Sequence, residues 1–236
     1  MSHAGYLGKV ICCALAPLAV SCSDWARGQT PSSAAGFEVS QYERVIDLSG
    51  WRPIAAGQER QKISKTVWRD RLRVKRLRAD AAALVMRRAE SDPEALRPEI
   101  TSSTHTLTVQ EVKGAMVTSA RSFEHAYDLR LDVSKESVGK WFDLSVDTVY
   151  WNAFSKGAGA VVGIPVQFPT QSVQLEIRSP NRKFERYDRI AFELVESSQK
   201  QVVEDTNSVM TPDHTRIIWR IDDARLNWVY AIHWQW

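Results

Sequence analysis

Beyond residue 22 the sequence contains no cysteine, because Cys12, Cys13 and Cys22 all lie near the N-terminus. The body of the chain therefore has no disulfide framework, no CxxC redox site and no thiolate zinc site. Side-chain packing must hold the fold together. The 236 residues, of which 44% are hydrophobic and 25% are charged, are enough to build a globular core.

Local signatures of catalysis, metal binding and phosphate binding are also missing. The sequence has no HxH or HExxH pair and no GxSxG elbow, and the Gly-containing loop 155–160 lacks the spacing GxxxxGK[ST]. His125 lies among apolar positions of a strand-like segment and is expected to be a core histidine. We expect no catalytic residue, no metal and no cofactor, although a Ser/His/Asp triad assembled by the fold stays open at this point.

The N-terminus has the pattern of an export signal. Lys9 precedes an apolar run over residues 10–20, which is too short to cross a bilayer as a helix but is typical of a secretory signal. The residues AVSC that end at Cys22 resemble a bacterial lipobox, with Ala19 where leucine is usual. We expect a signal peptide over 1–21, lipidation at Cys22 and a tether over 22–57. The alternative is an unprocessed apolar N-terminal helix on a cytoplasmic protein.

Positive charge is concentrated between residues 60 and 88, where eleven Lys and Arg face two acidic residues. Good helix formers without Gly or Pro predict a basic amphipathic helix over 58–96. Within it, residues 66–76 alternate strictly enough to form a strand with one basic face instead. Such a face could contact anionic lipid, an acidic partner or nucleic acid, or simply be solvated. The candidate contact residues are Arg69, Arg71, Arg73, Lys75, Arg76 and Arg78.

From residue 98 to 236, short alternating segments separated by turn residues predict a mainly β domain. The pattern is typical of an antiparallel β-sandwich, Ig-like or jelly-roll-like, with one face of each strand in water. The last two segments, 215–221 and 228–236, are predicted to pair as a hairpin with Trp219 opposite Tyr230. Trp228, Tyr230, Ile232 and Trp234 are then core residues, and Trp236 is partly exposed.

Function is the least determined property of the sequence. The turn-rich sandwich without catalytic motifs favours a non-enzymatic binding module in the bacterial cell envelope, held at the membrane through Cys22 or the basic segment. Export would separate it from nucleic acid. The alternatives are a cytoplasmic accessory or sensor domain and an exported glycan hydrolase, which would need Trp141 and Trp151 beside Asp143 and Asp147 in a cleft. The candidate ligand surface consists of Trp141, Trp151, Phe168 and Trp236.

Overall fold

The computed structural model describes residues 36–90, 95–112, 125–154, 160–193, 200–202 and 207–236, and this part of the chain is mainly β. It contains strands and no helix, and therefore no helix that could cross a membrane. The expected signal peptide, Cys22 and most of the loop 155–160 lie outside the described residues. The strands are β1 (Phe37–Gly50), β2 (Lys65–Arg76), β3 (Ala83–Glu90), β4 (Glu99–Thr101), β5 (Leu107–Glu111), β6 (His125–Asp132), β7 (Trp141–Trp151), β8 (Ala160–Pro165), β9 (Thr170–Arg178), β10 (Arg186–Glu193), β11 (Lys200–Val202), β12 (Ser208–Met210), β13 (Arg216–Asp222) and β14 (Trp228–Gln235).

The predicted basic helix over 58–96 is wrong. Its residues form β2 and β3, and the alternative of a strand over 66–76 is confirmed. In β2 every second side chain is buried, including Trp68, Leu72 and Val74, whereas Arg69, Arg71, Arg73 and Lys75 point outward. β2 pairs with β1 on one side and with β7 on the other. The hydrogen bonds to these two strands satisfy the backbone of β2, and this pairing outweighs the helix propensity of its residues. The sheet begins at Phe37, inside the range that we expected to be a tether.

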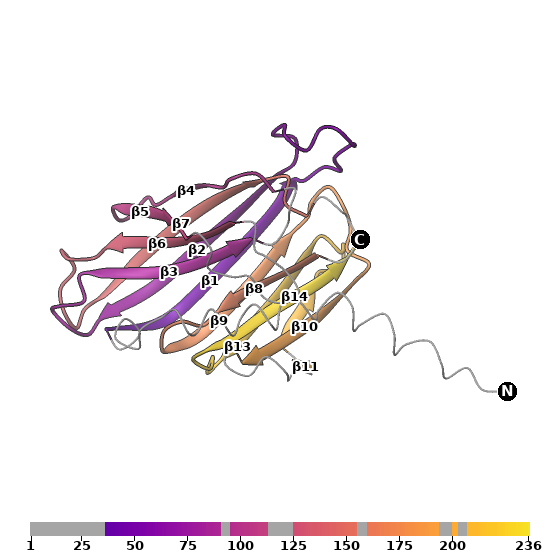
Figure 1. Ribbon diagram of the computed structural model, residues 1–236. Coiled ribbons are helices and arrows are strands. Elements are labelled where there is room, and N and C mark those ends of the chain that lie inside the picture. The colour runs from indigo at the N-terminus through magenta and orange to yellow at the C-terminus, as the bar shows by residue number, and fades with distance from the viewer. Residues whose placement is uncertain (1–35, 91–94, 113–124, 155–159, 194–199, 203–206) are drawn as a thin grey trace.

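The strands form three sheets (Figure 1). The largest has seven strands in the order β12-β13-β9-β1-β2-β7-β4, and the two others have the orders β11-β10-β14-β8 and β3-β6-β5. The arrangement is not purely antiparallel, because β1 and β9 pair in parallel. The long strands β1, β2 and β7 are consecutive in the seven-stranded sheet, between β9 and the edge strand β4, and carry most of its charged residues.

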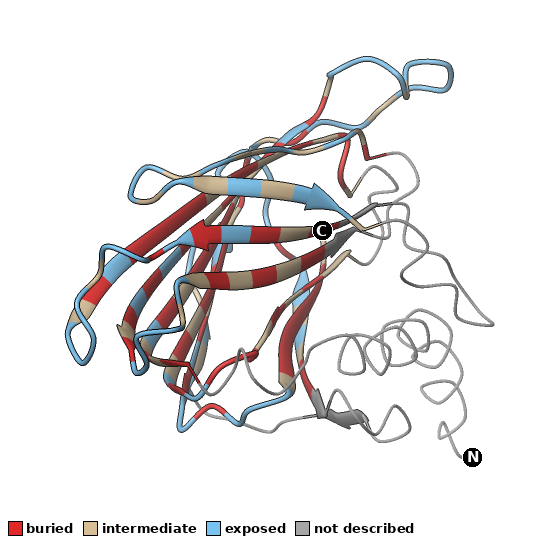
Figure 2. Cartoon of the chain, turned by 60° about the vertical axis from the view of Figure 1, so that its left-hand side comes forward, coloured by how far each residue is buried: buried red, intermediate tan, exposed pale blue. Residues whose placement is uncertain are grey.

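The smaller sheets contact the inner face of the seven-stranded sheet. Trp219 of β13 meets Tyr230 of β14 edge-to-face with 5.7 Å between ring centroids, and Arg44 of β1 donates to the carbonyl oxygen of Gly163 in β8. Buried residues alternate with less buried ones along β2 and β13 (Figure 2), so the seven-stranded sheet turns one face toward the core, whereas β14 is buried on both faces from Val229 to Trp234. Tyr230, Ile232 and Trp234 are buried as predicted, and Trp228 is half-buried.

The predicted hairpin between the last two strands is wrong. β13 pairs with β9 and β12, whereas β14 pairs with β8 and β10 in a different sheet. Trp219 and Tyr230 do meet, but they do so between two sheets and not across one ladder. An alternating pattern shows only that the apolar side of a strand must be covered by other apolar side chains. A neighbouring strand of the same sheet and a strand of the opposing sheet can both supply them, so the pattern did not distinguish the two arrangements.

Candidate functional site

The outward side chains of β1, β2 and β7 form a surface of alternating charge, which we call the outer charged face. A row of cations on β2 runs between carboxylates of the two neighbouring strands. Arg71 contacts Asp147 at 2.8 Å, and Arg73 contacts Asp143 at 3.0 Å. The other two pairs of this face are Arg69–Asp47 at 3.2 Å and Lys75–Glu38 at 2.6 Å.

The row of cations is therefore neutralised in place. Four of the six predicted contact residues belong to it, and each has a carboxylate partner. Arg76 is different, because it points inward, is buried, and donates to the carbonyl oxygens of Ser134 at 3.0 Å and Glu136 at 2.9 Å. Arg78 is exposed beyond the end of β2 and pairs with Asp80. We conclude that the concentration of positive charge in the sequence does not become a bare basic patch in the fold.

Two tryptophans mark the ends of β7 on the same outer face. The ammonium of Lys75 lies 4.7 Å from the ring centroid of Trp141. At the other end, Lys62 and Lys65 lie 5.5 and 5.9 Å from the ring of Trp151, whose indole N–H donates to Glu99 at 3.0 Å. Both rings are partly exposed, so they contribute apolar surface to an otherwise ionic face.

The carboxylates between these tryptophans are poorly placed for glycoside hydrolysis. Asp143 and Asp147 are four residues apart on one strand, which separates them by roughly 13 Å. Glycosidases place their two carboxyl groups about 5 to 10 Å apart. Each of the two is also held by an arginine on β2. The structure places the residues that the hydrolase hypothesis named along one face of β7, where the two carboxylates are ion-paired.

The other two candidate ligand residues are part of the packing. Phe168 is buried, and its ring meets that of Phe37 at 6.1 Å. Trp236 is half-buried against Trp51, at 4.7 Å between ring centroids, and the guanidinium of Arg182 lies over both indoles. Phe168 is therefore not a surface residue, and the prediction that Trp236 is partly exposed is confirmed.

A further group of ion pairs lies on β9 and β13, on the other side of β1 from β2. Glu176 is 2% exposed and contacts both Arg178 and Arg216 at 2.6 Å. Burial by itself raises the pKa of Glu176, but hydrogen bonds from the two guanidinium groups outweigh it and hold the pKa below its ordinary value of 4.5.

The low pKa of Glu176 predicts a loss of stability in acid. Because the folded pKa is below the unfolded one, the contribution of this carboxylate is complete above about pH 4.5 and is lost as the pH falls through the folded pKa. We expect Glu176→Gln to lower the free energy of unfolding at pH 7 and to flatten its decline between pH 5 and pH 3. Urea unfolding across this range would measure both effects, and parallel curves for the two proteins would contradict the prediction.

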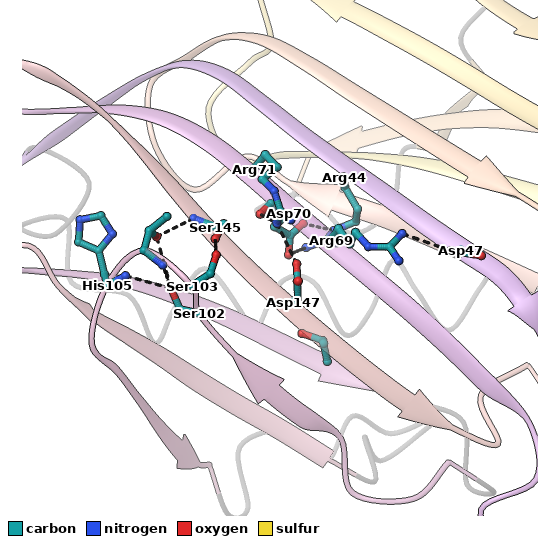
Figure 3. Close-up of polar contacts among 12 residues, drawn as sticks. Arg44, Asp47, Arg69, Asp70, Arg71, Ser102, Ser103, His105, Ser145 and Asp147 are labelled. Atoms are coloured by element: carbon teal, nitrogen blue, oxygen red, sulfur yellow. Dashed lines mark hydrogen bonds and ion pairs between the residues drawn. The ribbon is translucent and has the colours of Figure 1, made fainter.

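Sequence reasoning missed a buried charged cluster on the inner face, formed by Arg44, Asp70 and Arg88. Asp70 is fully buried and accepts a hydrogen bond from Nε of Arg44 at 2.7 Å (Figure 3). It also forms an ion pair with Arg88. Tyr42 donates to Asp70 at 3.2 Å and accepts from Arg44 at 2.8 Å. The sequence carried one signal for this cluster: as a strand, β2 places an aspartate among the inward residues Trp68 and Leu72.

Two guanidinium groups share one carboxylate in this cluster, so its three charges sum to +1. Burial lowers the pKa of Arg88 from its ordinary value of 12.5, while Tyr150 acts in the opposite direction. Arg44 is further stabilised by the ring of Trp68, whose centroid lies 5.2 Å from the guanidinium carbon. The cluster joins β1, β2 and β3 by strong directional contacts between sheets.

A histidine and a carboxylate lie near a pair of serines without forming a triad. His105 Nε2 contacts Glu136 at 3.2 Å, and its Nδ1 is buried without a hydrogen-bond partner in the described residues. Ser103 and Ser145 contact each other at 2.7 Å, and the His105 ring points away from them (Figure 3).

The described residues also contain no group of three His, Cys, Asp or Glu residues that could hold a metal ion.

Comparison with known proteins yields low similarity. Neither a family model nor a curated protein matches the sequence. Among solved structures, a candidate protease of Parabacteroides distasonis aligns with 86% of this chain and 41% of its own, at 8% identity and a TM-score of 0.49. Yeast LTA4 hydrolase in complex with bestatin aligns over 90% and 32%, at 9% identity and a TM-score of 0.41. The chain thus spans less than half the length of either protein, and these scores support no inference about activity.

Proposed function

We propose that the chain is a non-enzymatic β-sandwich interaction module of the bacterial cell envelope, held at the membrane by an acyl group on Cys22. The outer charged face is its binding surface in this proposal. The observation that carries the proposal is the row of paired charges on β1, β2 and β7, with partly exposed Trp141 and Trp151 at its two ends.

The chemistry of this face suits a polar macromolecular partner. Tryptophan and arginine are enriched where proteins bind other proteins, and fixed charges of both signs select a partner with the complementary pattern. Cross-strand ion pairs also hold the long side chains in place before binding, which lowers the entropy cost of ordering them. A folded protein or a charged glycan of the envelope is the class of partner that we propose.

In this proposal the lipid on Cys22 contacts the membrane and the basic segment does not, and the pairing of the cations supports this division. A lysine or arginine near an anionic bilayer contributes about 1 kcal/mol when its charge is free. On this face each cation of the row already has a carboxylate partner, so a bilayer would repel the acids as it attracted the bases. The lipid on Cys22 would supply the affinity for the bilayer, and the protein partner would add to it.

The proposed cellular location is tested by measuring the intact mass of the chain from its native host, in the membrane fraction and in the soluble fraction. We expect loss of residues 1–21 and added acyl mass on Cys22 in the membrane fraction, and Cys22→Ala should release the chain from it. A soluble chain that retains Met1 would overturn export and favour a cytoplasmic accessory module.

The binding face is tested separately with the folded chain from residue 23 onward. We expect it to bind vesicles of phosphatidylglycerol no better than vesicles of phosphatidylcholine at low salt. A photo-crosslinking residue at Trp151 should capture a discrete envelope component in cells, whereas the same residue at exposed Val209 on β12 should not. Strong, salt-sensitive binding to the anionic vesicles alone would indicate that the outer charged face binds the membrane surface, and would contradict this part of the proposal.

A further inference from the structure

A small cavity lies beside the buried charged cluster, where the seven-stranded sheet faces the middle of β3 and the end of β8. Its polar lining consists of Tyr42, Arg44, Arg87, Gln167 and Thr170. The space has room for about one water molecule or an ion of similar size. It is therefore too small for an organic ligand, and the question is which small species suits its lining.

The charge beside the cavity is positive. Arg44 lines the cavity and belongs to the cluster in which two guanidinium groups share the carboxylate of Asp70. Arg87, the other cation of the lining, is neutralised by Asp128 through contacts of 2.6 and 2.9 Å. One positive charge of the cluster thus stays uncompensated by these contacts, and a buried charge without a counter-charge is costly.

Two residues that line the cavity have hydrogen-bond donors without an acceptor in the described residues. Gln167 is 8% exposed, and its Nε2 has no hydrogen-bond partner in the described residues, while its Oε1 accepts from the backbone of Arg87. The guanidinium of Arg44 has five N–H groups and makes four hydrogen bonds, to Asp70 twice, to Tyr42 and to Gly163, so that one N–H on Nη1 is spare.

Two other polar groups of the lining, Tyr42 and Thr170, have their donors engaged elsewhere. Thr170 donates its hydroxyl proton to the carbonyl oxygen of Phe168 at 2.8 Å, and Tyr42 donates to Asp70. The lining thus contains Arg44 from the cluster with net positive charge, Arg87 neutralised by Asp128, and Gln167, whose Nε2 has no partner in the described residues. A species that only accepts hydrogen bonds and carries one negative charge satisfies both the cluster and Gln167, whereas water would leave the charge uncompensated.

We propose that this cavity is a binding site for one small monovalent anion of the size of chloride. Arg44 supplies the charge and one N–H, and Gln167 supplies the amide N–H. The bound anion would bring the buried cluster to neutrality and tie the seven-stranded sheet to the segment that follows β8. This site is independent of the proposed function, because it lies on the opposite side of the sheet from the outer charged face.

The test compares the stability of the whole chain in sodium chloride, sodium bromide and sodium gluconate at one ionic strength. We expect the melting temperature to rise in a saturable way with chloride or bromide and to stay constant with gluconate, which is too large for the cavity. In crystals grown with bromide, an anomalous scattering peak should lie between Arg44 and Gln167. Equal stability in all three salts, together with a cavity that holds only water, would overturn the proposal.

A charge-bearing variant makes the test specific to this cavity. Gln167→Glu places a carboxylate where the anion would bind, so the variant should lose its dependence on chloride and be more stable than the wild type in gluconate. The matched control is Gln58→Glu in the exposed segment between β1 and β2, which should keep the chloride dependence. If Gln167→Glu retained the full chloride effect, the anion would bind elsewhere and the site would be disproved.

Discussion

Replacing Asp70 by asparagine is expected to lower the free energy of unfolding by about 3 to 5 kcal/mol, because removal of one partner from a buried ion cluster leaves the others uncompensated. Asp70 is fully buried and is the acidic member shared by Arg44 and Arg88. Asparagine preserves the volume of the side chain but leaves two guanidinium groups together without a counter-charge. Urea unfolding at pH 7 and constant chloride concentration would measure the loss.

The matched control for Asp70→Asn is Asp143→Asn on the outer charged face. Asp143 also pairs with an arginine of β2, but its side chain is 74% exposed. Water and salt screen an exposed pair, so this change should cost no more than about 1 kcal/mol. Equal effects of the two substitutions would show that the buried cluster is not the polar anchor between the sheets that we infer.

The alternating pattern predicted the strand content well where one face of a strand meets water. Residues 141–151 and 170–178 alternate in sequence, and both form strands of the seven-stranded sheet. Each requires only a local period of two, which the sequence displays directly. The same period identified residues 66–76 as an alternative strand, and the structure confirms it as β2.

The helix prediction failed where local propensity and tertiary pairing disagree. Residues 79–86 contain four alanines with Leu84, Val85 and Met86, and this composition favours a helix in isolation. In the fold, Leu84 and Met86 are buried and pair with Leu131 and Leu129 of β6. The partner strand lies more than 40 residues away along the chain, so no local window of sequence contains the information that decides the outcome.

The outer charged face was only partly predictable for a similar reason. The cations of β2 were recognised from their density, but their neutralisation depends on Asp47 in β1 and Asp143 and Asp147 in β7. Those strands are distant in sequence and become neighbours only through the sheet order. Net charge along a segment therefore gave the wrong expectation for the charge of the surface, because cross-strand partners are counted elsewhere in the chain.

Replacing Trp219 by alanine is expected to destabilise the fold about as strongly as the loss of Asp70. Trp219 is fully buried in β13, and its ring packs edge-to-face on Tyr230 of the opposing sheet. Truncation of a buried tryptophan removes its burial energy and leaves a cavity, at a cost of about 3 to 5 kcal/mol. For a domain of this size that corresponds to a fall in melting temperature of about 10 °C, which calorimetry would measure.

The control for Trp219→Ala is Trp228→Ala, at the start of β14. Trp228 is half-buried, and its ring lies beneath the guanidinium of Arg225 at 4.8 Å. Because solvent can fill the space that this ring leaves, its truncation should cost roughly half as much or less. If both variants melted at the same temperature, the contact between Trp219 and Tyr230 would not be a main link between the two sheets. A larger loss at Trp219 places that link where the sequence suggested a hairpin, between residues that meet across the core.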